Sequence, residues 1–165
     1  MRVGNGLDIH PFQDPAEEES ERPLVLAGVE IAGAVPLAGH SDADVVAHAV
    51  ADALLGAAAL GDLGSRFGVD DPETAGADSL GLLRAVVRDV TDAGWKLGNL
   101  DVTVVAQRPR LAAHRQAMRT NLAESTGVDA DAVSVKFTTT DRLGAIGRSE
   151  GIAAWATCLL VPLRG

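Results

Sequence analysis

The chain has 165 residues, 47% of them hydrophobic, which is enough for one domain over residues 1–165 with a real apolar core. Its formal net charge of −9 argues against nucleic acid as a partner, because that binding relies on lysine and arginine contacts with phosphates. The single cysteine, Cys158, cannot form an internal disulfide and suits a reducing cytoplasm. We recognise neither a signal peptide nor an apolar stretch long enough to span a bilayer, so we expect a cytoplasmic protein without a membrane partner.

The first half of the chain predicts strands and then a helix. Residues 1–12 begin as an extended segment, 13–22 are acidic and predict an exposed loop, and 24–31 predict a strand-like stretch hinged at Ala27 and Gly28. Residues 41–60 carry a helical apolar stripe. Ser41 and Asp44 resemble a capping box at its start, and Gly61 is a plausible stop.

The second half alternates between the two kinds of element. We expect a helix over 79–93 capped by Asp78 or Ser79 and ended by Gly94, and a further helix over 111–126 followed by Gly127. Residues 100–107, 133–140 and 151–161 predict strands. This order predicts an α+β fold, a mixed sheet with helices on one face. The last strand begins with small residues that permit another element, or a second subunit, to approach closely.

Asp8 and His10 form a D-x-H pair in the first extended segment. Because side chains alternate along a strand, both face the same side and can reach one ion. A surface pair near a loop is the alternative explanation, since histidine is often an ordinary polar residue.

The predicted helix over 41–60 presents a third ligand candidate. Asp44, His48 and Asp52 recur every four residues and predict a polar edge in which a carboxylate one turn away orients the imidazole. A solvated helix face is the alternative, and we favour it for Asp52. His48 is flanked on both sides by Ala and Val residues and points toward the core boundary. With Asp8 and His10 it would complete a two-histidine, one-carboxylate set with an open fourth position, which is typical of catalytic zinc.

Two further stretches suit a phosphorylated ligand. The run 61–64, Gly-Asp-Leu-Gly, could offer Asp62 and backbone groups to a hydroxyl, although a plain helix stop would also explain it. Residues 136–141, Lys-Phe-Thr-Thr-Thr-Asp, lead into a glycine-rich loop that carries Arg148. Hydroxyls, free amides and cations are what a phosphate site needs. A threonine-rich strand on a solvated face would not explain the loop.

Taken together, these segments closely resemble the 2-C-methyl-D-erythritol 2,4-cyclodiphosphate synthase family of the non-mevalonate isoprenoid pathway. The matching stretches are MRVGNGLDIHPF, GHSDADVVAHAVADALLGAAALGDLG, GADS, LGNLDVTVVAQRPR, VSVKFTTTD and GRSEGI, in the expected order over nearly the whole chain. The resemblance implies a ferredoxin-like homotrimer with active sites between neighbouring subunits.

The resemblance also implies residue roles. Asp8, His10 and His48 would bind zinc or another divalent transition metal, His40 and Thr139 would stabilise the transition state, and Asp141 would hold a second metal, magnesium or manganese, with the diphosphate. The implied substrate contacts come from Asp8, Ile9, His10, His40, Ser41, Asp62, Leu63, Gly64, Asp71, Ala106, Gln107, Arg108, Pro109, Arg110, Leu111, Ala112, Lys136, Thr138, Thr139, Thr140, Asp141, Ala145 and Arg148. Of these, Ser41, Asp62 and Gly64 would contact the methylerythritol part, 106–112 would cradle cytosine, and 138–141 with Arg148 would hold the phosphates.

The sequence departs from the family pattern near the nucleotide. Asp141 stands where Glu is usual and is one methylene shorter, and Ala145 replaces the usual Phe. Residues 68–70 replace most of a PDTD run, so substrate contacts by residues 67–70 are in question. None of these changes touches the zinc set.

The implied reaction is cyclisation of 4-diphosphocytidyl-2-C-methyl-D-erythritol 2-phosphate with release of CMP. Two alternatives stay open: a zinc phosphoesterase that uses metal-bound hydroxide, and a non-catalytic trimer that binds a metabolite. We also consider an apolar channel at a trimer axis, lined by Leu7 and the small-residue strand, in which Arg148 grips an isoprenoid diphosphate.

Overall fold

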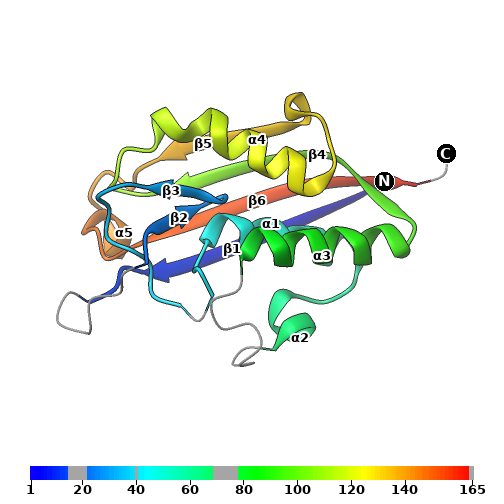
Figure 1. The fold of residues 1–165 in the computed structure, drawn as a ribbon, viewed down its shortest axis with the longest axis horizontal. Coiled ribbons are helices and arrows are strands. Elements are labelled where there is room, and N and C mark those ends of the chain that lie inside the picture. Colours follow the sequence, from blue (N-terminus) through cyan, green and yellow to red (C-terminus); the bar gives the residue numbers. More distant parts are fainter. Residues whose placement is uncertain (15–21, 40, 69–77, 164–165) are drawn as a thin grey trace.

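A four-stranded sheet in the order β1-β6-β4-β5 forms the centre of the protein (Figure 1). The computed structural model describes residues 1–14, 22–39, 41–68 and 78–163. The strands are β1 (Arg2–Pro11), β4 (Trp95–Val105), β5 (Val133–Thr138) and β6 (Gly151–Pro162). β6 pairs antiparallel with β1 and β4, whereas β5 runs parallel to β4, which confirms the mixed sheet that the sequence predicts.

Helices cover one face of this sheet (Figure 1). They are α1 (Val45–Ala58), α3 (Ser79–Asp92) and α4 (Arg115–Thr126), and a hairpin of β2 (Leu24–Leu26) and β3 (Val29–Ile31) lies against α1 and α4. One-turn helices α2 (Leu63–Phe67) and α5 (Gly144–Gly147) and the 3₁₀ turns η2 (Ala112–His114) and η3 (Ala130–Ala132) complete the described elements. The core lies between the helices and the sheet.

Helix α1 packs directly on β1 because two glycines of the strand have no side chain there. A Cβ atom on Gly6 would lie 2.0 Å from the carbonyl oxygen of Ala49, and one on Gly4 would lie 1.9 Å from that of Ala53. The helix backbone therefore touches the strand backbone, which brings the side chains of the two elements unusually close. This contact positions the first turns of α1 beside the second half of β1.

The start of α1 differs from the predicted capping box. Asp44, not Ser41, is the N-cap, and its carboxylate accepts hydrogen bonds from the amides of Val46 and Ala47 at 3.1 Å. The same carboxylate accepts from the amides of Ala27 at 2.8 Å and Gly28 at 2.7 Å in the hairpin turn. The side chain is fully buried, so the polar edge predicted to begin at Asp44 is wrong at that residue.

The other predicted elements are confirmed with small shifts in their ends. Asp78 caps α3, and Gly127 ends α4 in a left-handed conformation. β4 begins at Trp95, earlier than predicted, and β5 ends at Thr138, so the last two threonines of the TTT run lie beyond the strand. The short helices α2 and α5 were not predicted, because one turn is too short to show a helical period.

The opposite face of the sheet carries exposed apolar side chains. Val3, Leu7, Ile9 and Trp155 are 70%, 52%, 57% and 53% exposed, and Leu7 is the cross-strand partner of Trp155. Contiguous exposed apolar surface of this kind usually marks an interaction surface. Within the part of the chain that the structure describes, no helix has both the length and the apolar character needed to cross a membrane.

Candidate metal centre

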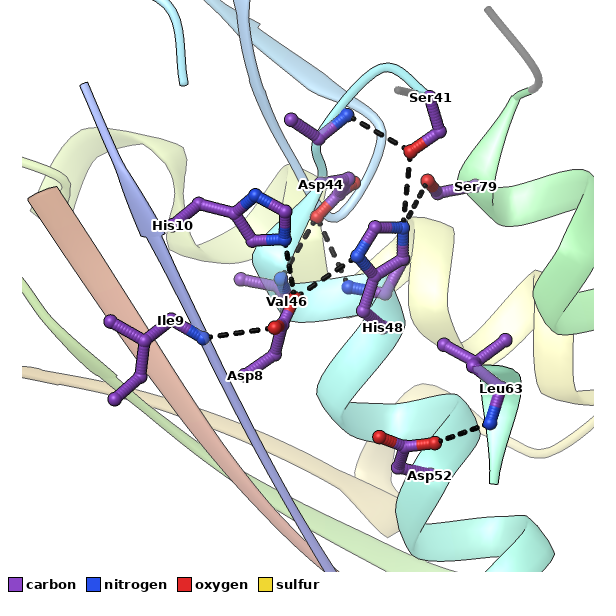
Figure 2. Close-up of polar contacts among 12 residues, drawn as sticks. Asp8, Ile9, His10, Ser41, Asp44, Val46, His48, Asp52, Leu63 and Ser79 are labelled. Carbon is purple, nitrogen blue, oxygen red and sulfur yellow. Dashed lines mark hydrogen bonds and ion pairs between the residues drawn. The ribbon is translucent and has the colours of Figure 1, made fainter. Parts of the chain in front are cut away.

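Three of the predicted ligands meet at one point (Figure 2). Asp8 and His10 project from the same face of β1, as alternation predicts, and His48 projects toward them from α1. Asp8 Oδ2 lies 3.0 Å from His10 Nε2 and 3.0 Å from His48 Nδ1, and the three ligand atoms lie within 4.8 Å of one another. Ligand atoms about 2 Å from a tetrahedral zinc ion are separated by roughly 3.3 Å, so this cluster has the right size.

The hydrogen bonds of His10 indicate which of its nitrogens is free to bind an ion. His10 Nδ1 lies 2.7 Å from the carbonyl oxygen of Ala38, which can only accept, so Nδ1 carries the proton. Nε2 therefore faces Asp8 with its lone pair whenever the ring is neutral. A lone pair and a carboxylate oxygen at 3.0 Å attract only through a shared proton or a cation, which makes the cluster suited to a divalent metal.

The shifted pKa values of Asp8 and His10 also favour a cation at this cluster. Burial opposes ionisation of Asp8, but the hydrogen bonds from His10 and His48 outweigh it and hold the pKa of this carboxyl well below its usual range. The hydrogen bond to Asp8 raises the pKa of His10. Protonation of His10 therefore competes with metal binding at this point.

A cavity of about 370 Å³ opens beside the cluster and is also lined by Ser41, Asp52, Leu63 and Gly64. The structure thus brings two of the residues predicted to contact the methylerythritol part, Ser41 and Gly64, to the metal cluster. Asp62 is the N-cap of α2 and forms a capping box with Ser65, so its carboxylate binds a backbone amide.

Several predicted contacts differ in detail. Ile9 lies on the opposite face of β1 from Asp8 and His10, and only its backbone amide points to the cluster, donating to Asp8 Oδ1 at 2.9 Å. Asp52, which the sequence indicated as an ordinary solvated residue, accepts a hydrogen bond at 2.8 Å from the amide of Leu63 and anchors the start of α2. The four-residue spacing between His48 and Asp52 was the sequence feature that could have indicated that Asp52 lies at the site. His40 and Asp71 lie outside the described residues.

The carboxylate predicted to orient His48 from one helical turn away is not the partner that the structure shows. Instead, His48 Nε2 lies 2.9 Å from Ser79 Oγ and 3.3 Å from Ser41 Oγ (Figure 2). The predicted polar edge is therefore wrong at Asp44, which is buried and binds backbone amides of the hairpin, whereas His48 and Asp52 line the same cavity. Ser79 was not expected at the site, and no periodicity around it indicated that role.

The segment 106–112, predicted to cradle cytosine, and the threonines at the end of β5 line a second cavity of about 340 Å³. Its described lining includes Thr138 and Thr139 and most of the predicted cytosine cradle, namely Ala106, Gln107, Pro109, Arg110, Leu111 and Ala112. Arg108 instead faces a larger neighbouring hollow, which Gln107, Pro109 and Arg110 also line. The grouping of 106–112 with the TTT run thus appears in the structure as an actual cavity.

The predicted phosphate ligands have other partners within the chain. Lys136 pairs with Asp101 on the neighbouring strand, and the guanidinium of Arg148 donates to Glu150 at 2.6 Å. The hydroxyl of Thr140 donates to the carbonyl of Leu143 at 2.6 Å. Asp141 lies beside Thr139, whose hydroxyl is 3.3 Å from its carboxylate, and the exposed Ala145 belongs to α5.

The two cavities lie at the same end of the sheet but at opposite edges. Asp8 and His10 belong to β1 and Thr138 to β5, with β6 and β4 between them. Three strand spacings correspond to roughly 14 Å, and the two cavities share no lining residue. Within one copy of the chain, the metal cluster and the second cavity are therefore separate.

The fold and the cluster define a class: an α+β protein with a two-histidine, one-carboxylate centre for a divalent metal, open to a polar cavity. The chain belongs to the YgbB family, whose family model matches residues 1–161. Among curated proteins it is 54% identical over 161 residues to the 2-C-methyl-D-erythritol 2,4-cyclodiphosphate synthase of Pectobacterium atrosepticum, covering 98% of this chain and 94% of the relative. It is 49% identical over 160 residues to the synthase of the same name from Thermosynechococcus vestitus, covering 97% and 96%.

Solved structures share the fold. The bifunctional IspDF from Campylobacter jejuni aligns with a TM-score of 0.89 at 42% identity, covering 96% of this chain and 42% of that one. The CDP complex of IspF from Plasmodium falciparum aligns with a TM-score of 0.83 at 32% identity, covering 98% and 96%. These matches confirm the family that the sequence motifs indicated.

Proposed function

We propose that this chain is a metal-dependent enzyme that converts 4-diphosphocytidyl-2-C-methyl-D-erythritol 2-phosphate into 2-C-methyl-D-erythritol 2,4-cyclodiphosphate and CMP, a step of non-mevalonate isoprenoid precursor synthesis. The observation that carries the proposal is the convergence of Asp8, His10 and His48 in a chain about half identical, over nearly its full length, to synthases of that name. The ligand CDP in a structural relative fits a nucleotide subsite.

Asp8, His10 and His48 would hold the first metal, zinc or a similar ion, and Asp141 a second, magnesium or manganese, beside the diphosphate. Bound there, the ions would neutralise phosphate oxygens and so reduce the repulsion between two anionic groups. The chain's own net charge of −9 makes such local neutralisation necessary. Arg148 and Lys136 would assist only after exchanging their present carboxylate partners for the substrate.

The protein's main contribution is alignment. A phosphate monoester is largely dianionic at neutral pH, since its second pKa is about 6, so the nucleophile needs little deprotonation. Holding it in line with the β-phosphorus can supply roughly 7–11 kcal/mol. Residues 106–112 would fix the cytosine, and Ser41, Asp62 and Gly64 the methylerythritol part. Thr139, with His40, would stabilise the charge that develops in the transition state.

The separation of the metal cluster from the proposed nucleotide cavity supports a homotrimer. The nucleotide cavity at the β5 edge of one subunit would meet the metal cluster at the β1 edge of the next, so each complete site would use two chains. The exposed apolar face with Leu7 and Trp155 is the surface available for burial in that assembly.

Product analysis tests the function. The metal-loaded protein is incubated with the CDP-linked substrate in oxygen-18 water, and the products are identified by mass. Unlabelled CMP and cyclic diphosphate support cyclisation. Label in either product would mean that water attacks phosphorus, as in a zinc phosphoesterase, and binding without turnover would indicate a metabolite-binding module.

A further inference from the structure

Nε2 of His48, the ring nitrogen that faces away from Asp8, contacts a chain of polar side chains that the proposed chemistry does not use. Ser79, the first residue of α3, lies with its hydroxyl 2.9 Å from His48 Nε2 (Figure 2). Ser79 is 1% exposed, so solvent does not compete for this contact. The contact joins two helices directly behind the metal cluster.

Asp42 determines the direction of the hydrogen bond between these residues. Its carboxylate oxygens accept from the amide of Ser79 at 3.0 Å and, by a short contact, from the hydroxyl of Ser79. The amide of Asp44 also donates to this carboxylate, at 3.2 Å. A carboxylate bound in this way takes the hydroxyl proton, so Ser79 Oγ is left to accept from His48.

The tautomer of His48 follows from this direction. In the neutral, metal-binding ring, Nε2 carries the proton and donates it to Ser79 Oγ, which leaves the lone pair on Nδ1, the atom that faces Asp8 Oδ2 at 3.0 Å. His10 reaches the equivalent state through the carbonyl of Ala38, a main-chain acceptor. His48 depends on side chains instead, so its orientation can be changed by substitution.

We infer that Ser79 and Asp42 are positioning residues that fix the tautomer and ring orientation of His48 for metal binding. This inference rests on the metal assignment of the proposed function. Hydrogen bonds of this kind to a ligating imidazole raise its basicity, and their loss typically lowers metal affinity by roughly 10–100-fold. Ser41, at 3.3 Å from the same nitrogen, is a secondary acceptor.

Cobalt affinity and the tautomer of His48 test the inference together. Co²⁺ binding is measured by chelator competition and visible spectra for the wild type, Ser79→Ala, Asp42→Asn and the double variant. Ser125→Ala, a buried serine of α4, is the matched control. Nitrogen-15 spectra of the histidines, recorded with Zn²⁺ bound, report which ring nitrogen of His48 carries the proton.

We expect Ser79→Ala and Asp42→Asn each to weaken Co²⁺ binding by roughly 10–100-fold. The double variant should be no weaker than Ser79→Ala, because Asp42 acts through the serine, and Ser125→Ala should match the wild type. A zinc-loaded wild-type His48 protonated on Nδ1 rather than Nε2, or single variants within twofold of wild-type affinity, would overturn the inference. If the wild type binds no cobalt, the metal assignment fails, and with it the positioning role for metal binding.

Discussion

The close contact between β1 and α1 makes Gly6→Ala an informative substitution. The new Cβ would lie 2.0 Å from the Ala49 carbonyl oxygen, whereas real Cβ contacts essentially never fall below 3.0 Å. The strand and the helix must therefore separate by roughly 1 Å, and both neighbours are backbone, which cannot rotate away. His48 precedes Ala49, so the separation acts directly on the metal cluster.

The expected losses of stability and of metal affinity can each be estimated. Overpacking of a dense interior costs about 1–3 kcal/mol, which lowers the Tm of a domain of this size by roughly 2–12 °C. Metal–ligand distances tolerate only about 0.2 Å, so a displacement of His48 relative to Asp8 several times larger should reduce zinc or cobalt affinity by at least about tenfold.

Gly56→Ala is the matched control. Gly56 is an exposed residue of α1, and a Cβ there would meet nothing within 4 Å. Alanine in a helix is favoured over glycine by about 0.5–1 kcal/mol, so this variant should melt at the same or a higher temperature with unchanged metal affinity. Thermal melts and chelator competition on both variants provide the measurements. Wild-type Tm and affinity for Gly6→Ala would refute the close-packing argument.

Three further predictions concern protonation, capping and assembly. Because Asp8 raises the pKa of His10, a proton competes with the ion, so metal affinity should fall as the pH is lowered from 8 to 5; calorimetry showing a flat profile would contradict this. Asp44→Ala leaves four amides without their acceptor and should lower the free energy of unfolding in urea by about 3–5 kcal/mol, against about 0.5–2 for the Asp78→Ala cap. Leu7→Asp should shift the proposed trimer toward monomer in sedimentation velocity, and a trimer with the same stability as the wild type would exclude the open sheet face from the interface.

The local sequence pattern predicted the structure correctly wherever a single strand or helix determines where a side chain lies. Alternation in the first strand placed Asp8 and His10 on one face, and apolar periodicity placed His48 on a helix that faces the core. The helix start was mispredicted because Asp44 binds amides of the hairpin at Ala27 and Gly28, a contact between segments far apart in the sequence. A short window of sequence does not include both partners of that contact, so local pattern cannot predict it.

The same limit applies to the site. Asp52 looked like a solvated helix residue, yet it binds α2, an element too short to show a period. Ser79 lies 31 positions from His48, and only the packing of α3 beside α1 brings its hydroxyl to the imidazole. The supporting contacts of a metal ligand thus come from tertiary structure, whereas the ligand types themselves can be identified from spacing.

The start of β1 and the end of β6 lie side by side, with Arg2 opposite Leu160, at the end of the sheet away from the metal cluster (Figure 1). The strand rise places Arg2 roughly 26 Å from His10. A segment joined before Arg2 or after Pro162 would therefore leave the sheet at the end away from the metal cluster. The fold offers two neighbouring attachment points from which the protein can be immobilised or joined to another enzyme with its cavities left open.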